Sequence, residues 1–129
     1  RFFIYDLKND RIINSGLVAH GSCNNYFLEN VWFSNLPGCG CSSSGLYKIG
    51  SKYIGKFGKS YKLTGLEKTN SNALKRAIVL HSYKDIPDHE IYPNPIGNSL
   101  GCPMTSYKFF NILSNYIDSS KRPILLYIF

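Results

Sequence analysis

Cys102 lies in the stretch GNSLGCPM (residues 97–104), between a glycine and a proline and shortly before a segment that we expect to be helical. At the N-terminus of a helix, the dipole and the unsatisfied N–H groups favour a thiolate over a thiol. Gly101 would let the backbone approach a substrate closely, and the N–H of Cys102 could donate to an oxyanion. Pro103 has no N–H to give and suits a turn or a first helical position. These features make Cys102 a candidate nucleophile.

A nucleophilic cysteine also needs a base, and the chain offers His20, His81 and His89. His81 is the best placed, because it ends a run, residues 76–81, that we interpret as a buried strand. Ser82 follows, and its backbone carbonyl or hydroxyl could orient the imidazole. His89 lies in a Pro-rich segment and is expected to be exposed. From the residues alone, a Cys/His pair is compatible with a catalytic or a structural role.

The elements that must position these side chains are mostly strands. Residues 2–7 and 11–20 predict a hairpin, and further strands are expected over residues 46–54, 60–66, 76–81 and 124–129. Residues 70–75 form at best a helical turn. Three prolines between His81 and Ser99 exclude regular structure there, and the segment is long enough to be an active-site flap. Thr105 or Ser106 can cap one helix whose apolar positions share a face: Phe109, Phe110, Ile112, Leu113, Tyr116 and Ile117.

Length and composition indicate one domain spanning residues 1–129, with 43% hydrophobic and 18% charged residues. No run approaches the ~18 apolar residues of a spanning helix, so we expect no stable membrane insertion. The chain opens in an apolar strand with no initiator Met or signal peptide, which suggests a longer precursor. We expect a monomer.

The formal net charge of +7 is uneven, because residues 30–66 contain no acid but contain five lysines. This basic half could serve solubility or attract an acidic polymer. No Arg-rich helix or RNA-binding signature accompanies the lysines, so a nucleic-acid partner is not expected.

Six segments, taken in order, resemble the L,D-transpeptidase catalytic (YkuD-like) domain, and in particular its murein L,D-transpeptidase branch. They are LVAHG (17–21), FSN (33–35), SSSGLY (42–47), GKFGKSYKLTGLEK (55–68), NALKRAIVLH (72–81) and SLGCP (99–103). The family's core signature is a histidine followed, after a spacer, by Ser/Thr-x-Gly-Cys. Here it appears as His81 and Ser99-Leu100-Gly101-Cys102.

The resemblance implies a β-rich α+β fold, a mixed β-sandwich or barrel with one helix packed before the last strand. It implies action on peptidoglycan stem peptides in the periplasm or envelope of a bacterium, without a cofactor or metal. Cys102 would form a thioester with a tetrapeptide stem, release D-Ala and transfer the stem to an acceptor amine. His81 would be the base, and the N–H groups of Cys102 and Gly101 would bind the oxyanion. Water as acceptor would give an L,D-carboxypeptidase, and a non-catalytic wall-binding module is a third alternative.

Further site residues follow from the same resemblance. Ser99 and Ser82 join the catalytic set, although the branch more often has glycine after the histidine. Leu100 stands where the commoner motif has histidine. The expected substrate-binding residues are His20, Gly21, Ser44, Tyr47, Arg76 and Leu100, with pairing between Glu67 and Arg76 as a scaffold alternative for Arg76.

The other cysteines, Cys23, Cys39 and Cys41, lie in loops that the family usually fills with Gly and Ser. A disulfide from Cys23 to Cys39 or to Cys41 would stabilise by roughly 3 kcal/mol in the chain-entropy estimate. A Cys39–Cys41 link would be strained. Zinc bound with His20, or free thiols, are the alternatives.

Overall fold

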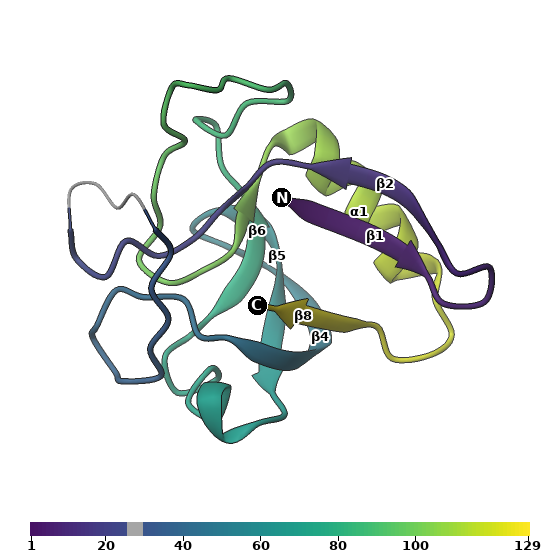
Figure 1. Ribbon diagram of the computed structural model, residues 1–129. Coiled ribbons are helices and arrows are strands. Elements are labelled where there is room, and N and C mark those ends of the chain that lie inside the picture. Colours follow the sequence, from purple (N-terminus) through teal and green to yellow (C-terminus); the bar gives the residue numbers. More distant parts are fainter. Residues whose placement is uncertain (26–29) are drawn as a thin grey trace.

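The computed structural model describes residues 1–25 and 30–129, and it consists of two β-sheets and one α-helix (Figure 1). The predicted β-rich α+β fold, with one helix before the last strand, is confirmed. In chain order the elements are β1 (Phe2–Asp6), β2 (Arg11–Gly16), β3 (Val18–Ala19), β4 (Gly45–Gly55), β5 (Gly58–Gly65), the 3-10 helix η1 (Lys68–Asn70), β6 (Val79–Ser82), β7 (Met104–Thr105), α1 (Tyr107–Ser119) and β8 (Leu125–Ile128). No helix in this described part of the chain has the length and apolar character needed to cross a bilayer.

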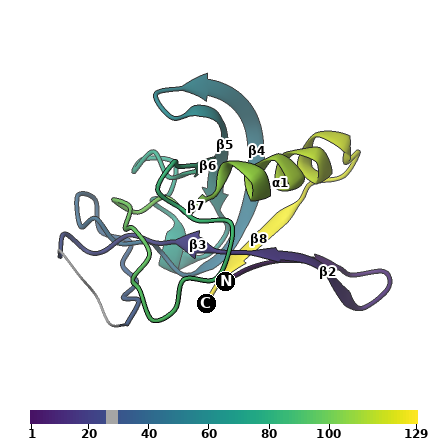
Figure 2. The same ribbon diagram turned by 90° about the horizontal axis from the view of Figure 1, so that it is seen from above.

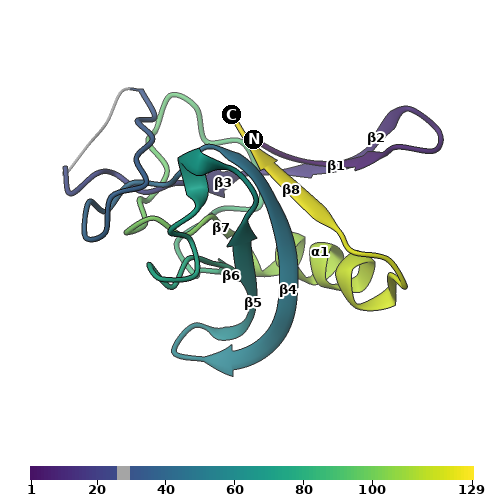
Figure 3. The same cartoon turned by 90° about the horizontal axis from the view of Figure 1, so that it is seen from below.

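The larger sheet has the strand order β3-β7-β6-β5-β4-β8, and β1 pairs with β2 in a separate hairpin. Within the described residues, β6 and β7 form the parallel pair of the larger sheet and its other named strand pairs are antiparallel. The long strands β4 and β5 curl strongly (Figures 2 and 3), and the register between Ile49 and Lys52 of β4 is shifted against β5. The curl turns the larger sheet into a half-barrel.

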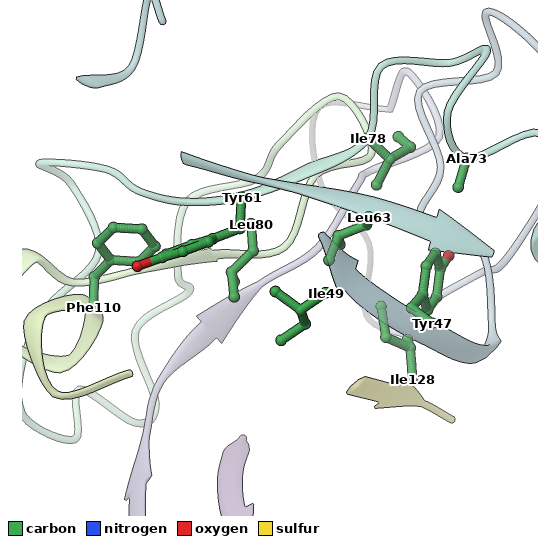
Figure 4. Close-up of a cluster of buried hydrophobic side chains, with 9 residues drawn as sticks. All are labelled: Tyr47, Ile49, Tyr61, Leu63, Ala73, Ile78, Leu80, Phe110 and Ile128. Atoms are coloured by element: carbon green, nitrogen blue, oxygen red, sulfur yellow. The ribbon is translucent and has the colours of Figure 1, made fainter. Parts of the chain in front are cut away.

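The main core lies inside this curl and is formed largely by side chains from one face of the strands (Figure 4). Its buried members are Tyr47, Ile49, Tyr61, Leu63, Ala73, Ile78, Leu80, Phe110 and Ile128. Successive side chains of a strand point to opposite faces. Because Leu80 of β6 points into this core, its neighbour His81 projects from the opposite face of the strand.

Helix α1 packs against both the larger sheet and the β1–β2 hairpin. Of the two predicted caps, Thr105 and Ser106, the structure has Ser106, whose hydroxyl accepts a hydrogen bond of 3.1 Å from the Phe109 N–H. Phe110 packs into the main core, and Phe109 packs edge-on against Phe2 of β1 with ring centroids 5.7 Å apart. Tyr116, expected on the apolar face, is exposed.

The strand predicted over residues 76–81 begins later, at Val79, because Ala77 has a left-handed φ of 53° and belongs to a turn. The segment 83–98 has no helix or strand, as its prolines predicted. This segment and the loop residues 20–25 and 30–44 gather at the end of the molecule away from the β1–β2 turn (Figures 1 and 2).

Candidate active site

The Cys102 thiol lies where the β6–β7 pairing ends. His81 is opposite Met104 in this parallel register, so Cys102, two residues earlier, is level with Val79. The N–H of His81 donates to the Pro103 carbonyl at 3.4 Å, and the N–H of Val79 donates to Cys102 Sγ, also at 3.4 Å. The thiol in turn donates a long hydrogen bond of 3.9 Å to the Ala77 carbonyl. Along β6, the Cys102 sulfur thus accepts from the Val79 N–H in the place where a backbone carbonyl would continue the pairing with β7.

The prediction that Cys102 is activated by a helix N-terminus is wrong. Strand β7 and the cap Ser106 separate it from α1, which begins at Tyr107. Burial raises the pKa of the Cys102 thiol above its ordinary value, and the Val79 N–H and the Arg76 guanidinium only partly oppose this. The resting side chain is therefore a neutral thiol at neutral pH.

Among the described residues, the His81 imidazole makes one hydrogen bond and stacks on one aromatic ring. Its Nδ1 lies 2.9 Å from the Ser82 carbonyl oxygen, as the sequence suggested. A carbonyl only accepts, so Nδ1 carries the proton and Nε2 is left with a free lone pair. The ring stacks on Phe57, and His81 as a residue is only 1% exposed. Burial lowers the pKa of His81, which keeps it a neutral base.

Cys102 and His81 are close in the sheet, although they are not hydrogen-bonded. Their two-residue offset on neighbouring strands corresponds to about 7 Å along the strand direction. Among the described residues, neither hydrogen bond of the thiol is made to His81. Cys102 packs against the main core while its sulfur accepts from the Val79 N–H, so the resting thiol is turned away from the His81 face. Rotation about the Cα–Cβ bond would turn it toward the His81 face.

The oxyanion donors differ from the prediction. The Gly101 N–H donates to the Ser99 hydroxyl at 3.0 Å, so this donor is already used. The Cys102 N–H has no acceptor within the part of the chain that the structure describes, and it remains the candidate donor. Position 101 requires glycine for two reasons: its φ is +126°, and a Cβ there would lie 2.9 Å from the Cys41 carbonyl oxygen.

Ser42 joins the His20 loop to the Cys102 loop, and the sequence did not single it out. Its hydroxyl donates to the Gly101 carbonyl at 2.9 Å, accepts from the Gly21 N–H at 3.0 Å and lies 3.2 Å from His20 Nδ1. The Ser99 N–H completes the connection by donating to the His20 carbonyl at 2.9 Å. Burial lowers the pKa of His20 to about 4. A buried small polar residue in a Ser-Ser-Ser run gives no local signal of this role.

The loop cysteines form one disulfide, between Cys23 and Cys41, and Cys39 is free. This selects one of the two predicted pairings and takes both sulfurs out of the zinc alternative. Within the described residues, no group of three or more His, Cys, Asp or Glu side chains could hold a metal ion.

Arg76 ties these loops to the site. Its guanidinium donates to the Ser34 carbonyl at 2.8 Å, the Ser43 hydroxyl at 2.7 Å, the Cys39 sulfur at 3.4 Å and the Cys41 carbonyl. The alternative pairing with Glu67 is wrong. The Glu67 carboxylate instead accepts from the Leu46 N–H at 3.1 Å.

Two hollows flank the Cys102 loop. One, of about 240 Å³, is lined by His20 and Gly21 and by Pro95 and Ile96 of the Pro-rich segment. The other, of about 310 Å³, is lined by Lys75, Arg76, Ile78 and Leu100 among others.

Leu100, Ser44 and Tyr47 are placed very differently. Leu100 is 79% exposed, so it is available to a ligand, and Ser44 is half-buried just before β4. Tyr47 is 0% exposed and donates to the Ser43 carbonyl at 2.8 Å. It is therefore a core residue, and its predicted contact with substrate is wrong.

Comparison with known families matches residues 1–129 to the model described as the L,D-transpeptidase catalytic domain. A search of curated proteins finds no match.

Proposed function

Because the chain belongs to the L,D-transpeptidase catalytic domain family, we propose that it is a cysteine-dependent peptidoglycan L,D-transpeptidase. The observation that carries this proposal is the hydrogen bond of His81 Nδ1 to the Ser82 carbonyl. It leaves Nε2 as a free, neutral base on the strand beside the Cys102 loop. Family membership and this geometry support the same pair of residues.

In the first half-reaction, substrate binding turns the Cys102 thiol toward His81. The sulfur attacks the carbonyl carbon of the bond between the diamino acid and D-Ala, and its proton passes to His81 Nε2. The carbonyl oxygen becomes an oxyanion that accepts from the Cys102 N–H, a donor typically worth about 3 to 4 kcal/mol. The C–N bond then breaks, D-Ala leaves with the proton from His81, and a thioester remains.

In the second half-reaction an acceptor amine gives a proton to His81 Nε2 and attacks the thioester carbonyl. The C–S bond breaks, the sulfur regains the proton, and a new amide links the two stems. Ser99 and Ser82 take no part in bond making. They act by holding Gly101 and His81 through the hydrogen bonds at 3.0 and 2.9 Å.

We assign substrate contacts to the two hollows. His20 and Gly21 line one of them, and Arg76 and Leu100 line the other. Stem peptides carry carboxylates, and Lys75 suits such a ligand. Arg76, whose terminal N–H groups bind the loops, adds positive charge to the same hollow. An enzyme of this family acts on the cell wall, so we propose a bacterial envelope location and a monomer as the working form.

Incubation with purified muropeptides that carry tetrapeptide stems tests the proposal. Cross-linked dimers with released D-Ala indicate transfer, tripeptides indicate hydrolysis, and unchanged substrate indicates a non-catalytic module. Cys102→Ala should abolish turnover, whereas Cys39→Ser, which also removes a free thiol, should retain it. Full activity of Cys102→Ala would overturn the mechanism.

A further inference from the structure

Phe57 occupies a position where an aromatic side chain is unusual. It lies at the tip of the β4–β5 hairpin, in the two-residue turn between the paired residues Gly55 and Gly58. Such turns favour Gly, Asn, Asp and Pro. Gly58, the residue that follows the turn, takes the left-handed conformation with φ of +73°. Phe57 is 42% exposed and is absent from the main core cluster. Neither the turn nor the core therefore requires a phenylalanine.

What Phe57 does contact is the candidate base. Its ring stacks on the His81 imidazole with centroids 4.3 Å apart and an interplanar angle of 16°. Tyr83 meets Phe57 edge-on at 6.4 Å and 73°, which fixes the Phe57 ring from the side. The β4–β5 hairpin is strongly curled (Figure 3). Phe57 at its tip, 24 positions upstream of His81, covers one face of the imidazole.

We propose that Phe57 is a positioning residue for the reaction: by stacking on His81 it fixes the plane of the imidazole and excludes water from it. The proposal deepens the proposed function and rests on His81 as its base. The Ser82 carbonyl fixes only the direction of Nδ1 and leaves rotation of the ring about that hydrogen bond open. A stacked ring removes this freedom, so the two contacts together set where Nε2 points.

The burial of His81 supports the same role. Among the described residues, the ionisable groups on β5, the β4–β5 turn and the chain flanking β6 and β7 are Lys56, Lys59, Tyr61, Lys62, Tyr83 and Cys102. The carboxylate on the helix packed against β6, Asp118, is bound by Lys52 and Lys59. Burial lowers the pKa of His81, the hydrogen bond to the Ser82 carbonyl opposes this only in part, and the neutral imidazole is favoured.

An NMR titration of the His81 ring tests the contact without any substrate, with His81→Gln identifying its resonances. In Phe57→Ala the His81 pKa should rise toward its ordinary value of about 6.5, because water reaches the ring. Phe57→Trp should keep the wild-type titration, and Phe57→Leu, which fills space without stacking, serves if the alanine variant does not fold. Ile54→Ala is the matched control, since Ile54 is an 80% exposed apolar residue of the same hairpin.

Turnover with muropeptides gives the second readout. Phe57→Ala should lower kcat/KM about three- to tenfold, the range of a lost aromatic contact, and should move the acid limb of the pH profile upward. An unchanged His81 titration in Phe57→Ala, or a uniform loss shared with Ile54→Ala, would overturn the proposal. If the wild-type protein turns over no muropeptide, the proposed function fails, while the titration still decides whether Phe57 controls His81.

Discussion

Two free thiols in this protein should respond to pH in opposite ways, and this tests the proposed resting state of the site. Burial raises the pKa of Cys102. Burial also acts to raise that of Cys39, but the Cys41 N–H, the Ser34 side chain and the Arg76 guanidinium together bring it below its ordinary value. Since only thiolates react with iodoacetamide, Cys39 should be alkylated at lower pH than Cys102.

The magnitude follows from the ordinary thiol pKa of about 8.5, at which roughly 3% is thiolate at pH 7. Cys102 should lie below this fraction and Cys39 above it. The alkylation rate of Cys102 should rise about tenfold between pH 7 and 8, because a thiol well below its pKa gains tenfold in thiolate per pH unit. The rate of Cys39 should rise less steeply over the same interval.

Peptide mass spectrometry after timed iodoacetamide pulses resolves the two sites, and each rate is normalised to its own plateau at high pH. Cys23 and Cys41 are protected by their disulfide. His81→Gln should leave the Cys102 profile unchanged, since the resting thiol bonds to Val79 and Ala77 rather than to His81. An inflection for Cys102 below that of Cys39, or one lost in His81→Gln, would mean a resting thiolate–imidazolium pair and would refute the reasoning.

Four further outcomes are expected. Replacing both Cys23 and Cys41 by serine should lower the free energy of unfolding by about 3 kcal/mol in urea titrations, because the disulfide links residues 18 positions apart. Ser106→Ala should cost about 1 kcal/mol in the same assay by removing the cap of α1. Gly101→Ala should cost about 1 to 3 kcal/mol and lower turnover further, because a Cβ at φ +126° meets the Cys41 carbonyl. With the pKa of His20 near 4 when folded, the unfolded chain binds more protons below pH 6.5, so stability should fall as pH drops from about 6.5 to 4. His20→Gln should flatten that part of the pH dependence, measured by thermal melts.

The sequence predicted best what depends on neighbouring residues. Alternation and turn residues placed the strands of the β1–β2 and β4–β5 hairpins, and Ser106 followed by periodic apolar residues placed α1. The Ser82 carbonyl was within reach of His81 because it is the next residue. In each case the interacting residues are only a few positions apart, so a short stretch of sequence is enough to predict the interaction.

The sequence failed where the contact is long-range. Cys102 was placed at the helix because the two-residue strand β7 has no pattern of its own, and only its parallel pairing with β6 shows it. Ser42 lies 59 residues from the Gly101 carbonyl that it holds, and Phe57 lies 24 residues from His81. Tyr47 was expected to bind substrate, but it is buried, because strands β5 and β8 lie on either side of β4.

The disulfide is part of the site's support. With only two residues in β7, the Cys102 loop has little regular structure of its own and is held by contacts with distant parts of the chain, among them the Ser99 N–H bond to the His20 carbonyl. Ser42 binds Gly101, the N–H of Ser22 donates to the Ser99 carbonyl at 3.2 Å, and Gly101 lies over the Cys41 carbonyl. Cys23 directly follows Ser22, and Cys41 directly precedes Ser42. The disulfide between the two cysteines therefore joins the two segments that make these contacts. In a variant with Cys23 and Cys41 replaced by serine, the Cys102 loop should therefore become disordered at a lower urea concentration than the main core. Turnover should then be lost at a lower urea concentration than the one at which the main core unfolds.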